Sequence, residues 1–240
     1  MYRVSSLLLL SGFLFFISVI VVTLPVGEPP MLIGQQIQTL SVEQTGAANF
    51  VTAVVLGYRG IDTLGELSIL FAAAAAGSLV LSTRRRKSPS SFSSSAPSQA
   101  SLQTDNAGFL VSAAADLLLP LLVVVGLYIV IHGHLTPGGG FQGGVILAAA
   151  FFLPVLARPS DPLKHSVLVF LEGFAGASFI IIGLIGLFYH HGFLVPMLNK
   201  GNIGELFSAG TLPLLYCAVG LKVGAELAGL LSLLNEEEGE

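Results

Sequence analysis

The sequence predicts an all-α integral membrane protein with about six transmembrane helices. Hydrophobic residues make up 53% of the 240 residues, charged residues only 10%, and the mean hydropathy is +0.85, whereas an ordinary soluble domain is roughly 25% charged. The apolar residues fall in runs of about 20, the length that an α-helix needs to cross a bilayer; barrel strands would give short alternating segments. We therefore expect a protein embedded in the bilayer, not a soluble enzyme and not a partner of nucleic acid. The flexible Gly-rich stretch at 132–144, set between two apolar runs, further points to a transport machine or its scaffold.

Six apolar runs are candidate spans, of which the fourth is short and therefore tilted or broken. They lie near residues 5–24, 62–82, 109–131, 144–158, 165–188 and 206–234. The first run follows Arg3 and so resembles a signal peptide, but it is long for one. Its end at Thr23-Leu24-Pro25-Val26 also lacks the small residues of a cleavage site. We expect a retained first span.

The basic residues in short loops predict the orientation, because Lys and Arg accumulate on the cytoplasmic side. A basic run at 84–87 follows the second span, and Arg158 and Lys164 flank the loop between the fourth and fifth. Both loops are therefore expected in the cytoplasm. Six spans then place both termini in the cytoplasm and put 25–60, 132–144 and 189–205 on the outer side.

A Ser/Pro-rich segment at residues 88–106 predicts a cytoplasmic linker, because it cannot bury enough apolar surface to order itself. It divides the chain into a two-span module, 1–87, and a four-span module, 107–240. We find no internal repeat, so the inverted-repeat architecture of many transporters has no support. The chain is not expected to transport by itself.

The first module carries a charged motif just before its second span. Arg59, Asp62 and Glu66 would share one face of a continuous helix, because residues three and four apart are neighbours. One interpretation is structural: Thr63 and Glu66 form a capping box and Arg59 pairs with Asp62. The other is that Glu66 faces a polar cavity about one turn inside the membrane, where a carboxylate can bind a cation or relay a proton. The two interpretations are compatible.

The second module contains a Gly-rich loop at 132–144, between two apolar runs. Gly138, Gly140 and Gly143 spell G-x-G-x-x-G, but no strand or βαβ unit precedes them, so a nucleotide site is rejected. We expect these glycines to allow close helix approach or a tight re-entrant turn. Pro137 would stop a helix, and Phe141 would fill the space above the turn.

Two histidines and the single cysteine are weaker candidates. His132 and His134 are two apart and would point to different faces of a helix, and no third ligand lies nearby. A metal site is therefore not expected, and loop hydrogen bonding or a proton-relay role is favoured. Cys217 lies inside an apolar run, where it is expected to pack as a small apolar residue.

Charges within the spans need partners, because an isolated charge at the bilayer centre costs on the order of 2.5–3.5 kcal/mol on insertion scales. Lys222 and Glu226 are four apart in the sixth span and predict a mutually neutralising pair on a protein-facing side. A role in transport is the alternative for Lys222. Asp116 and Glu172 lie near the cytoplasmic ends of their spans, where snorkelling or loop contacts cost little free energy, and a role in transport is the alternative for them too.

Two of these motifs resemble a known family. The segment His-Gly-His-Leu-Thr-Pro-Gly-Gly-Gly-Phe-Gln-Gly-Gly at 132–144, with Gly-Leu-Lys-Val-Gly-Ala at 220–225, resembles the B subunit of Mrp-type multisubunit cation/proton antiporters. Residues 46–70 resemble the C-terminal extension of the A subunit, which in membrane-bound hydrogenases is a separate small subunit. The resemblance covers most of the chain except the Ser-rich linker and implies a fusion of two small subunits, related to the membrane arm of respiratory complex I.

The resemblance also implies roles for particular residues. Glu66 and Asp62 would be acidic groups on a sodium path, with Arg59 as their basic neighbour. The loop residues that shape this path would be Pro137, Gly138, Gly139, Gly140 and Phe141. We add Lys222 to the candidate ion path, and His132 and His134 as candidate proton relays.

The leading hypothesis is therefore an accessory, path-forming subunit of a Na+/proton antiporter in the plasma membrane of a prokaryote. Its partners would be large proton-pumping subunits and small accessory subunits. No cofactor and no enzymatic activity are expected of this chain. One alternative is an ion-translocating subunit of a membrane-bound hydrogenase or related redox complex, where partners carry the redox chemistry. Another is a structural scaffold that holds neighbouring subunits.

Overall fold

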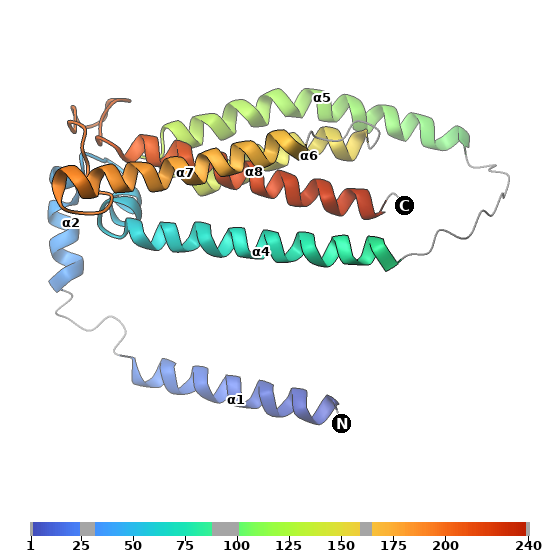
Figure 1. Ribbon diagram of the computed structural model, residues 1–240, viewed down its shortest axis with the longest axis horizontal. Coiled ribbons are helices and arrows are strands. Elements are labelled where there is room, and N and C mark those ends of the chain that lie inside the picture. Colours follow the sequence, from blue (N-terminus) through green and yellow to red (C-terminus); the bar gives the residue numbers. More distant parts are fainter. Residues whose placement is uncertain (1, 25–31, 88–100, 159–164, 239–240) are drawn as a thin grey trace. The chain divides into compact units, whose positions relative to one another are not determined.

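The computed structural model describes residues 2–24, 32–87, 101–158 and 165–238 (Figure 1). Six helices are long and apolar enough to cross a membrane, and the described residues contain no strand, which confirms the expected all-α membrane fold. The helices in chain order are α1 (Tyr2–Thr23), α2 (Leu32–Thr45), α3 (Phe50–Thr52), the π-helix η1 (Ala53–Tyr58), α4 (Gly60–Lys87), α5 (Ser101–Ile131), α6 (Gly140–Ala157), α7 (His165–His190) and α8 (Leu212–Glu238).

The chain forms two compact units, Met1–Leu40 and Ser41–Glu240. In the first unit, α1 is apolar around its whole circumference and its described side chains are exposed. Its polar side chains satisfy themselves locally: the hydroxyls of Ser11, Ser18 and Thr23 each donate to a backbone carbonyl three or four residues earlier. A hydroxyl in the hydrocarbon core has no water to bond, so it must find its acceptor within the helix.

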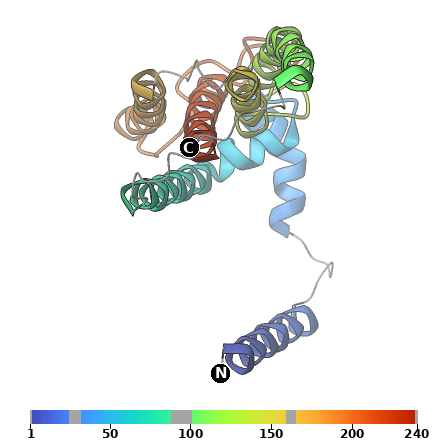
Figure 2. The same ribbon diagram turned by 90° about the vertical axis from the view of Figure 1, so that its right-hand side faces the viewer.

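In the second unit, α8 is the central helix. It packs against α4, α5, α6 and α7, and α5 also packs against α6 (Figure 2). The buried core lies along α8 and the elements that touch it, and includes Leu56, Leu67, Val130, Phe179, Leu212, Leu215, Val219 and Val223. Most large apolar side chains on the outer faces of α4, α5 and α7 are exposed, as expected for helices whose solvent is lipid.

Two helix boundaries differ from those expected from the hydrophobic runs. α6 begins at Gly140 instead of 144, because its glycines pack on neighbouring helices and helix propensity does not decide the boundary there. α8 begins at Leu212 instead of 206. The preceding residues turn with positive φ at Ala209 and Gly210, and Pro213 occupies the first helical turn, where a missing N–H is tolerated.

The expected linker is partly helical. Ser101 to Asn106 form the first turns of α5, because these residues include neither Pro nor Gly and continue directly into the apolar run. Residues 88–100, and the loop 159–164 with Lys164, lie outside the described residues. The two compact units divide after Leu40 and not at the predicted linker, because α4 packs on α8 and therefore belongs to the second unit. The two-module division stays a prediction about the sequence.

The segment expected as an outer loop, 25–60, contains α2, α3 and η1. None of these helices carries an apolar run of spanning length, so hydropathy gave no signal for them. Residues 25–31 lie outside the described residues. The short helices bring the beginning of α4 against the Gly-rich loop, which positions the candidate site.

Candidate functional site

Residues 46–70 and the Gly-rich loop at 132–144 meet at one end of the second unit. The side-chain amide of Asn49 donates to the carbonyls of Gly133 and Thr136, at 2.8 Å each. The hydroxyl of Thr52 donates to the carbonyl of Gly133 at 2.5 Å, and the backbone N–H of Asn49 donates to the carbonyl of His134 at 2.9 Å. Four hydrogen bonds therefore fix the segment before α4 to the Gly-rich loop, although more than 80 residues separate them along the chain.

A π-helix leads from this junction into α4. η1 covers Ala53–Tyr58, and its last turn closes with the N–H of Arg59 donating to the carbonyl of Val54 at 2.9 Å. π-Helical turns are rare in proteins as a whole, and those that occur are often found at functional sites. The guanidinium of Arg59 then pairs with the carboxylate of Asp62 at 2.5 Å, as the spacing predicted. Both side chains are largely exposed, 69% and 45%.

The expected capping box at Thr63 and Glu66 is wrong. α4 begins three residues earlier, at Gly60, so Thr63 lies inside the helix and its hydroxyl donates to the carbonyl of Val55 in η1. Asp62 is the acidic residue in the first turn of α4, where the positive end of the helix dipole stabilises its carboxylate. Glu66 is thereby free of the capping role.

Glu66 lies inside the candidate span Gly60–Leu81 and is exposed on the surface of this chain. It lies about 9 Å along α4 from Gly60, at 1.5 Å per residue. Its neighbours on this face include Asp62 and the exposed Ile69. Among the described residues no hydrogen bond or ion pair to Glu66 is found.

Lys222 does not lie on the face of α4 that carries Glu66. Its ammonium contacts Glu226 at 2.9 Å and Glu172 at 3.5 Å, and lies 5.1 Å from the centre of the Phe71 ring. Phe71 and Glu66 are both on α4 but are offset by roughly 140° around the helix axis. The predicted Lys222–Glu226 pair is confirmed. Glu172 was not expected to join it, because no local spacing links α7 to α8.

The Gly-rich loop forms a tight turn between α5 and α6. α5 already ends at Ile131, so Pro137 does not stop it and is instead exposed within the turn. Gly138 and Gly139 have φ angles of 153° and 141°, which residues with a Cβ rarely adopt. A Cβ on Gly139 would also lie 2.8 Å from the Tyr216 ring.

The glycines that follow allow close helix approach, as the sequence predicted. A Cβ on Gly140 would lie 2.7 Å from Cβ of Val219, and one on Gly144 would lie 2.8 Å from Cβ of Val223. α6 therefore packs closely on α8. Phe141 is half-buried against the same core, which is compatible with its expected space-filling role.

The two histidines have different surroundings. His132 stacks on Tyr128, with ring centres 4.1 Å apart, and its Nδ1 lies 3.1 Å from the Tyr128 carbonyl. His134 is fully buried and neither ring nitrogen has a hydrogen-bond partner among the described residues, although the backbone of Glu205 and Leu206 approaches the ring. Burial lowers the pKa of His134, so its ring is neutral at pH 7.

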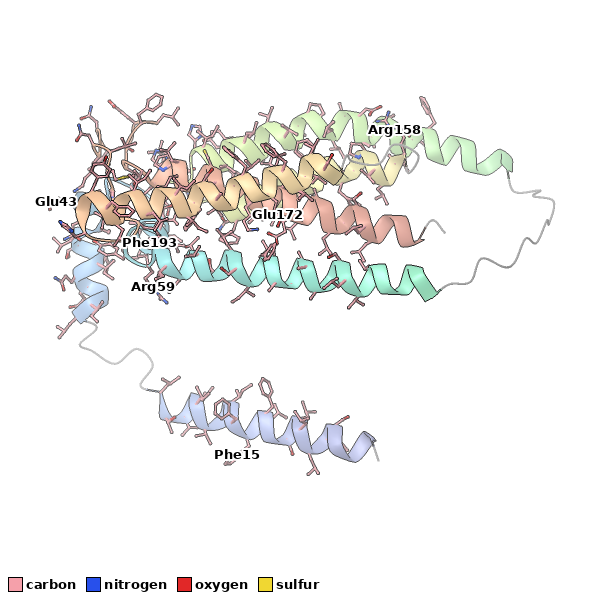
Figure 3. The ribbon with its side chains drawn as sticks, viewed as in Figure 1. Phe15, Glu43, Arg59, Arg158, Glu172 and Phe193 are labelled. Carbon is pink, nitrogen blue, oxygen red and sulfur yellow. The ribbon has the colours of Figure 1, made fainter. Side chains whose placement is uncertain are left out.

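The other end of the second unit carries a separate ion pair. Arg158, at the end of α6, pairs with Asp116 of α5, so Asp116 has the loop contact that its position near a span end suggested. Arg158, Glu172 and Arg59 mark successive levels along the helices (Figure 3). In the described part of the chain, no group of three His, Cys, Asp or Glu residues is placed to hold a metal ion.

The sequence is similar to a known family and to a protein of another organism. The family described as a domain related to the MnhB subunit of Na+/H+ antiporter matches residues 110–229. An uncharacterized protein of Methanocaldococcus jannaschii is 33% identical over 204 residues, which cover 79% of this chain and 78% of that protein.

Two solved structures are similar over nearly the whole chain. A chain of the membrane-bound sulfane sulfur reductase, an archaeal respiratory membrane complex, is 35% identical with a TM-score of 0.73, and 97% of each chain is covered. A chain of the Mrp complex from Dietzia sp. is 26% identical with a TM-score of 0.74. The match covers 96% of this chain but 26% of that longer one.

Proposed function

Because the chain belongs to the family of domains related to the MnhB subunit of Na+/H+ antiporters, we propose that it forms part of the ion path in a multisubunit cation/proton antiporter. It acts as a transporter subunit and not as an enzyme. The observation that carries the proposal is the exposed carboxylate of Glu66 inside a membrane-spanning helix.

An exposed carboxylate in a span requires a partner. Ionisable residues in membrane helices almost always face a bundle interior or a water-filled cavity, because a charge facing lipid is costly. Glu66 faces away from the core of this chain. A second membrane subunit, or water held between the two subunits, therefore covers this face of α4 in the assembled complex.

The geometry suggests how such a path works. Asp62 lies about one turn and Arg59 about two turns before Glu66 on the outer side of the span, where their ion pair sets the entrance. Glu66 then alternates between Na+ and a proton, since one carboxylate cannot hold both. The hydrogen bonds of Asn49 and Thr52 to the Gly-rich loop fix the start of α4, so the loop shapes the path indirectly.

The proposed orientation follows the basic residues. Arg158 and the basic run at 84–87 lie at the end of the second unit opposite to Arg59 (Figure 3), and Lys and Arg favour the cytoplasmic side. The ion entrance at Arg59 then faces the outside of a prokaryotic plasma membrane, and both termini face the cytoplasm.

A second host complex is favoured by one observation. A similar chain, matched over 97% of both chains, is part of an archaeal respiratory membrane complex. The same ion path would then be driven by electron transfer in partner subunits. Mild-detergent purification with mass spectrometry separates the two: iron–sulfur or nickel subunits indicate the redox host, and antiporter-like membrane subunits alone indicate the antiporter.

The proposed path is tested by Glu66→Gln in the assembled complex. We expect Na+-dependent proton exchange in inverted membrane vesicles to be lost, because glutamine cannot carry either ion, while assembly stays normal. Glu43→Gln is the matched control, since Glu43 is exposed but lies outside the span. Full exchange by an assembled Glu66→Gln complex would rule out the path.

A further inference from the structure

Two open cavities lie one after the other between α4 and α7, against α8 and on the face of α4 opposite to Glu66. One has a volume of about 170 Å³ and is lined by Leu64, Ser68, Gly176 and Lys222, among others. The other, about 380 Å³, lies further toward the proposed cytoplasmic side and is lined by Ser78, Glu172, Gly173 and Glu226, among others. Each has room for several water molecules. Phe71 lines both and therefore marks the boundary between them.

A buried charged cluster occupies this boundary. Lys222 and Glu226 are 7% and 3% exposed, and the side chain of Glu172 is 22% exposed. The ammonium of Lys222 contacts both carboxylates, at 2.9 and 3.5 Å. Its alkyl chain passes Gly176 of α7, where an added Cβ would lie 3.6 Å from Cδ of Lys222. Lys222 therefore reaches the outer cavity while holding the two acids of the inner one.

The charges of this cluster do not balance. Two carboxylates and one ammonium leave one net negative charge at membrane depth, which is costly. Lys222, Glu172 and Glu226 are the only charged residues among those lining either cavity. Moreover, the second carboxylate oxygen of Glu226, Oε1, is buried without a hydrogen-bond partner in the described structure. One additional positive charge on Glu172 or Glu226 would neutralise the cluster.

We propose that Glu172 and Glu226 hold one exchangeable proton beside Lys222 and pass it between the two cavities. Protonation of one carboxyl makes the cluster neutral. Release of that proton to water in one cavity restores the negative charge, which favours uptake of a proton from the other. A sodium ion fits poorly, because Lys222 already occupies the carboxylates and few other oxygens line the cavities.

This relay is separate from the path proposed at Glu66. Leu64, Ser68 and Phe71 of α4 line the outer cavity, and Asp62 and Glu66 are offset from Phe71 by about 180° and roughly 140° around the helix. α4 therefore lies between the two ion-handling regions. The relay needs only residues of this chain, whereas the Glu66 face needs a partner.

Carbodiimide labelling tests the bound proton directly, because these reagents modify protonated carboxyls in apolar sites. The assembled complex is treated with dicyclohexylcarbodiimide at several pH values, and modified residues are located by mass spectrometry. We expect labelling of Glu172 or Glu226 that falls as pH rises and is unchanged by Na+. Absence of labelling at every pH would overturn the relay, and protection by Na+ would replace the proton with a sodium ion.

Glu226→Gln sharpens this experiment. Glutamine keeps the shape of the side chain, and Lys222 with Glu172 alone is neutral, so the variant complex is expected to assemble. Glu172 should then lose its label, because no proton is needed for neutrality, and Na+-dependent proton exchange should fall at least tenfold. Normal exchange would overturn the relay. Ser232→Ala is the control, since Ser232 is a buried polar residue of α8 that lines neither cavity.

The labelling result does not depend on Glu66. If the proposed path at Glu66 is wrong, the carboxyls of Glu172 and Glu226 are still expected to react. Conversely, loss of exchange in Glu66→Gln together with unlabelled Glu172 and Glu226 would support the sodium path and reject the relay.

Discussion

The two faces of α4 hold their charges in different ways. On one face, Arg59 and Asp62 form an exposed ion pair and Glu66 has no partner within the described chain. On the other, Phe71 packs beside Lys222, whose ammonium is enclosed by Glu172 and Glu226. The described residues give Glu66 on the first face no partner, whereas Lys222 on the second face has both of its carboxylate partners within this chain. Their mutational effects should differ accordingly: stability depends on the buried cluster, and complex-dependent transport depends on the exposed face.

The largest expected effect on stability is at Lys222. Lys222→Met leaves the buried Glu226 and the half-buried Glu172 without their cation, and removing one partner of a buried ion pair costs about 3–5 kcal/mol. The measurement is the thermal unfolding midpoint and yield of the purified complex. The double variant Lys222→Met/Glu226→Met should recover much of the loss. A single variant as stable as the unmodified complex would show that this cluster does not stabilise the fold.

The next largest effect concerns the junction that positions both faces of α4. Asn49→Ala removes two hydrogen bonds to the Gly-rich loop and the cap that Asn49 provides to the N–H of Val51. We expect a loss of about 2–3 kcal/mol, at about 1 kcal/mol for each bond and for the cap. Denaturant unfolding of the complex measures it.

Thr52→Val provides the graded control for this junction. It removes one hydrogen bond with little change of shape, so the loss should be about 1 kcal/mol. Equal and negligible losses in both variants would mean that the junction does not hold α4 in place.

A smaller effect is expected from pH through His134. Burial lowers its pKa below the usual value of 6.5, so below that value the unfolded chain binds more protons than the folded one. The contribution of His134 to the free energy of unfolding is fully present above about pH 6.5 and is lost as the pH falls through the lowered pKa of the folded state. Unfolding midpoints measured from pH 5 to 8 should decline toward acid less steeply in His134→Gln. An identical decline in both proteins would contradict this.

The smallest effect on stability is expected at Arg59. Its ion pair with Asp62 is exposed, and such pairs are worth about 0–1 kcal/mol. Arg59→Ala should therefore leave the unfolding midpoint nearly unchanged while altering the concentration of Na+ needed for half-maximal exchange. A large loss of stability with unchanged Na+ dependence would reverse the roles assigned to the two faces.

Local patterns in the sequence predicted much of this arrangement. Runs of apolar residues identified the six spans, and spacings of three or four residues identified the Arg59–Asp62 and Lys222–Glu226 pairs. These signals act within one helix and need no knowledge of its neighbours.

The rest depends on contacts between distant segments. Glu172 joins Lys222 only because α7 packs on α8, and Asn49 meets the Gly-rich loop across 84 residues. The capping box at Thr63 failed because η1 and α3, which have no hydropathy signal, move the start of α4 to Gly60. Side-chain periodicity carries no information about such packing.

The most direct test of the account is Na+/Na+ self-exchange, followed with radioactive sodium in vesicles without a pH gradient. This exchange needs the sodium path but no net proton movement. The account predicts that Glu66→Gln abolishes it and that Glu226→Gln retains it, although both variants lose Na+-dependent proton exchange. Undiminished self-exchange in an assembled Glu66→Gln complex would contradict the central claim that the exposed face of α4 carries sodium.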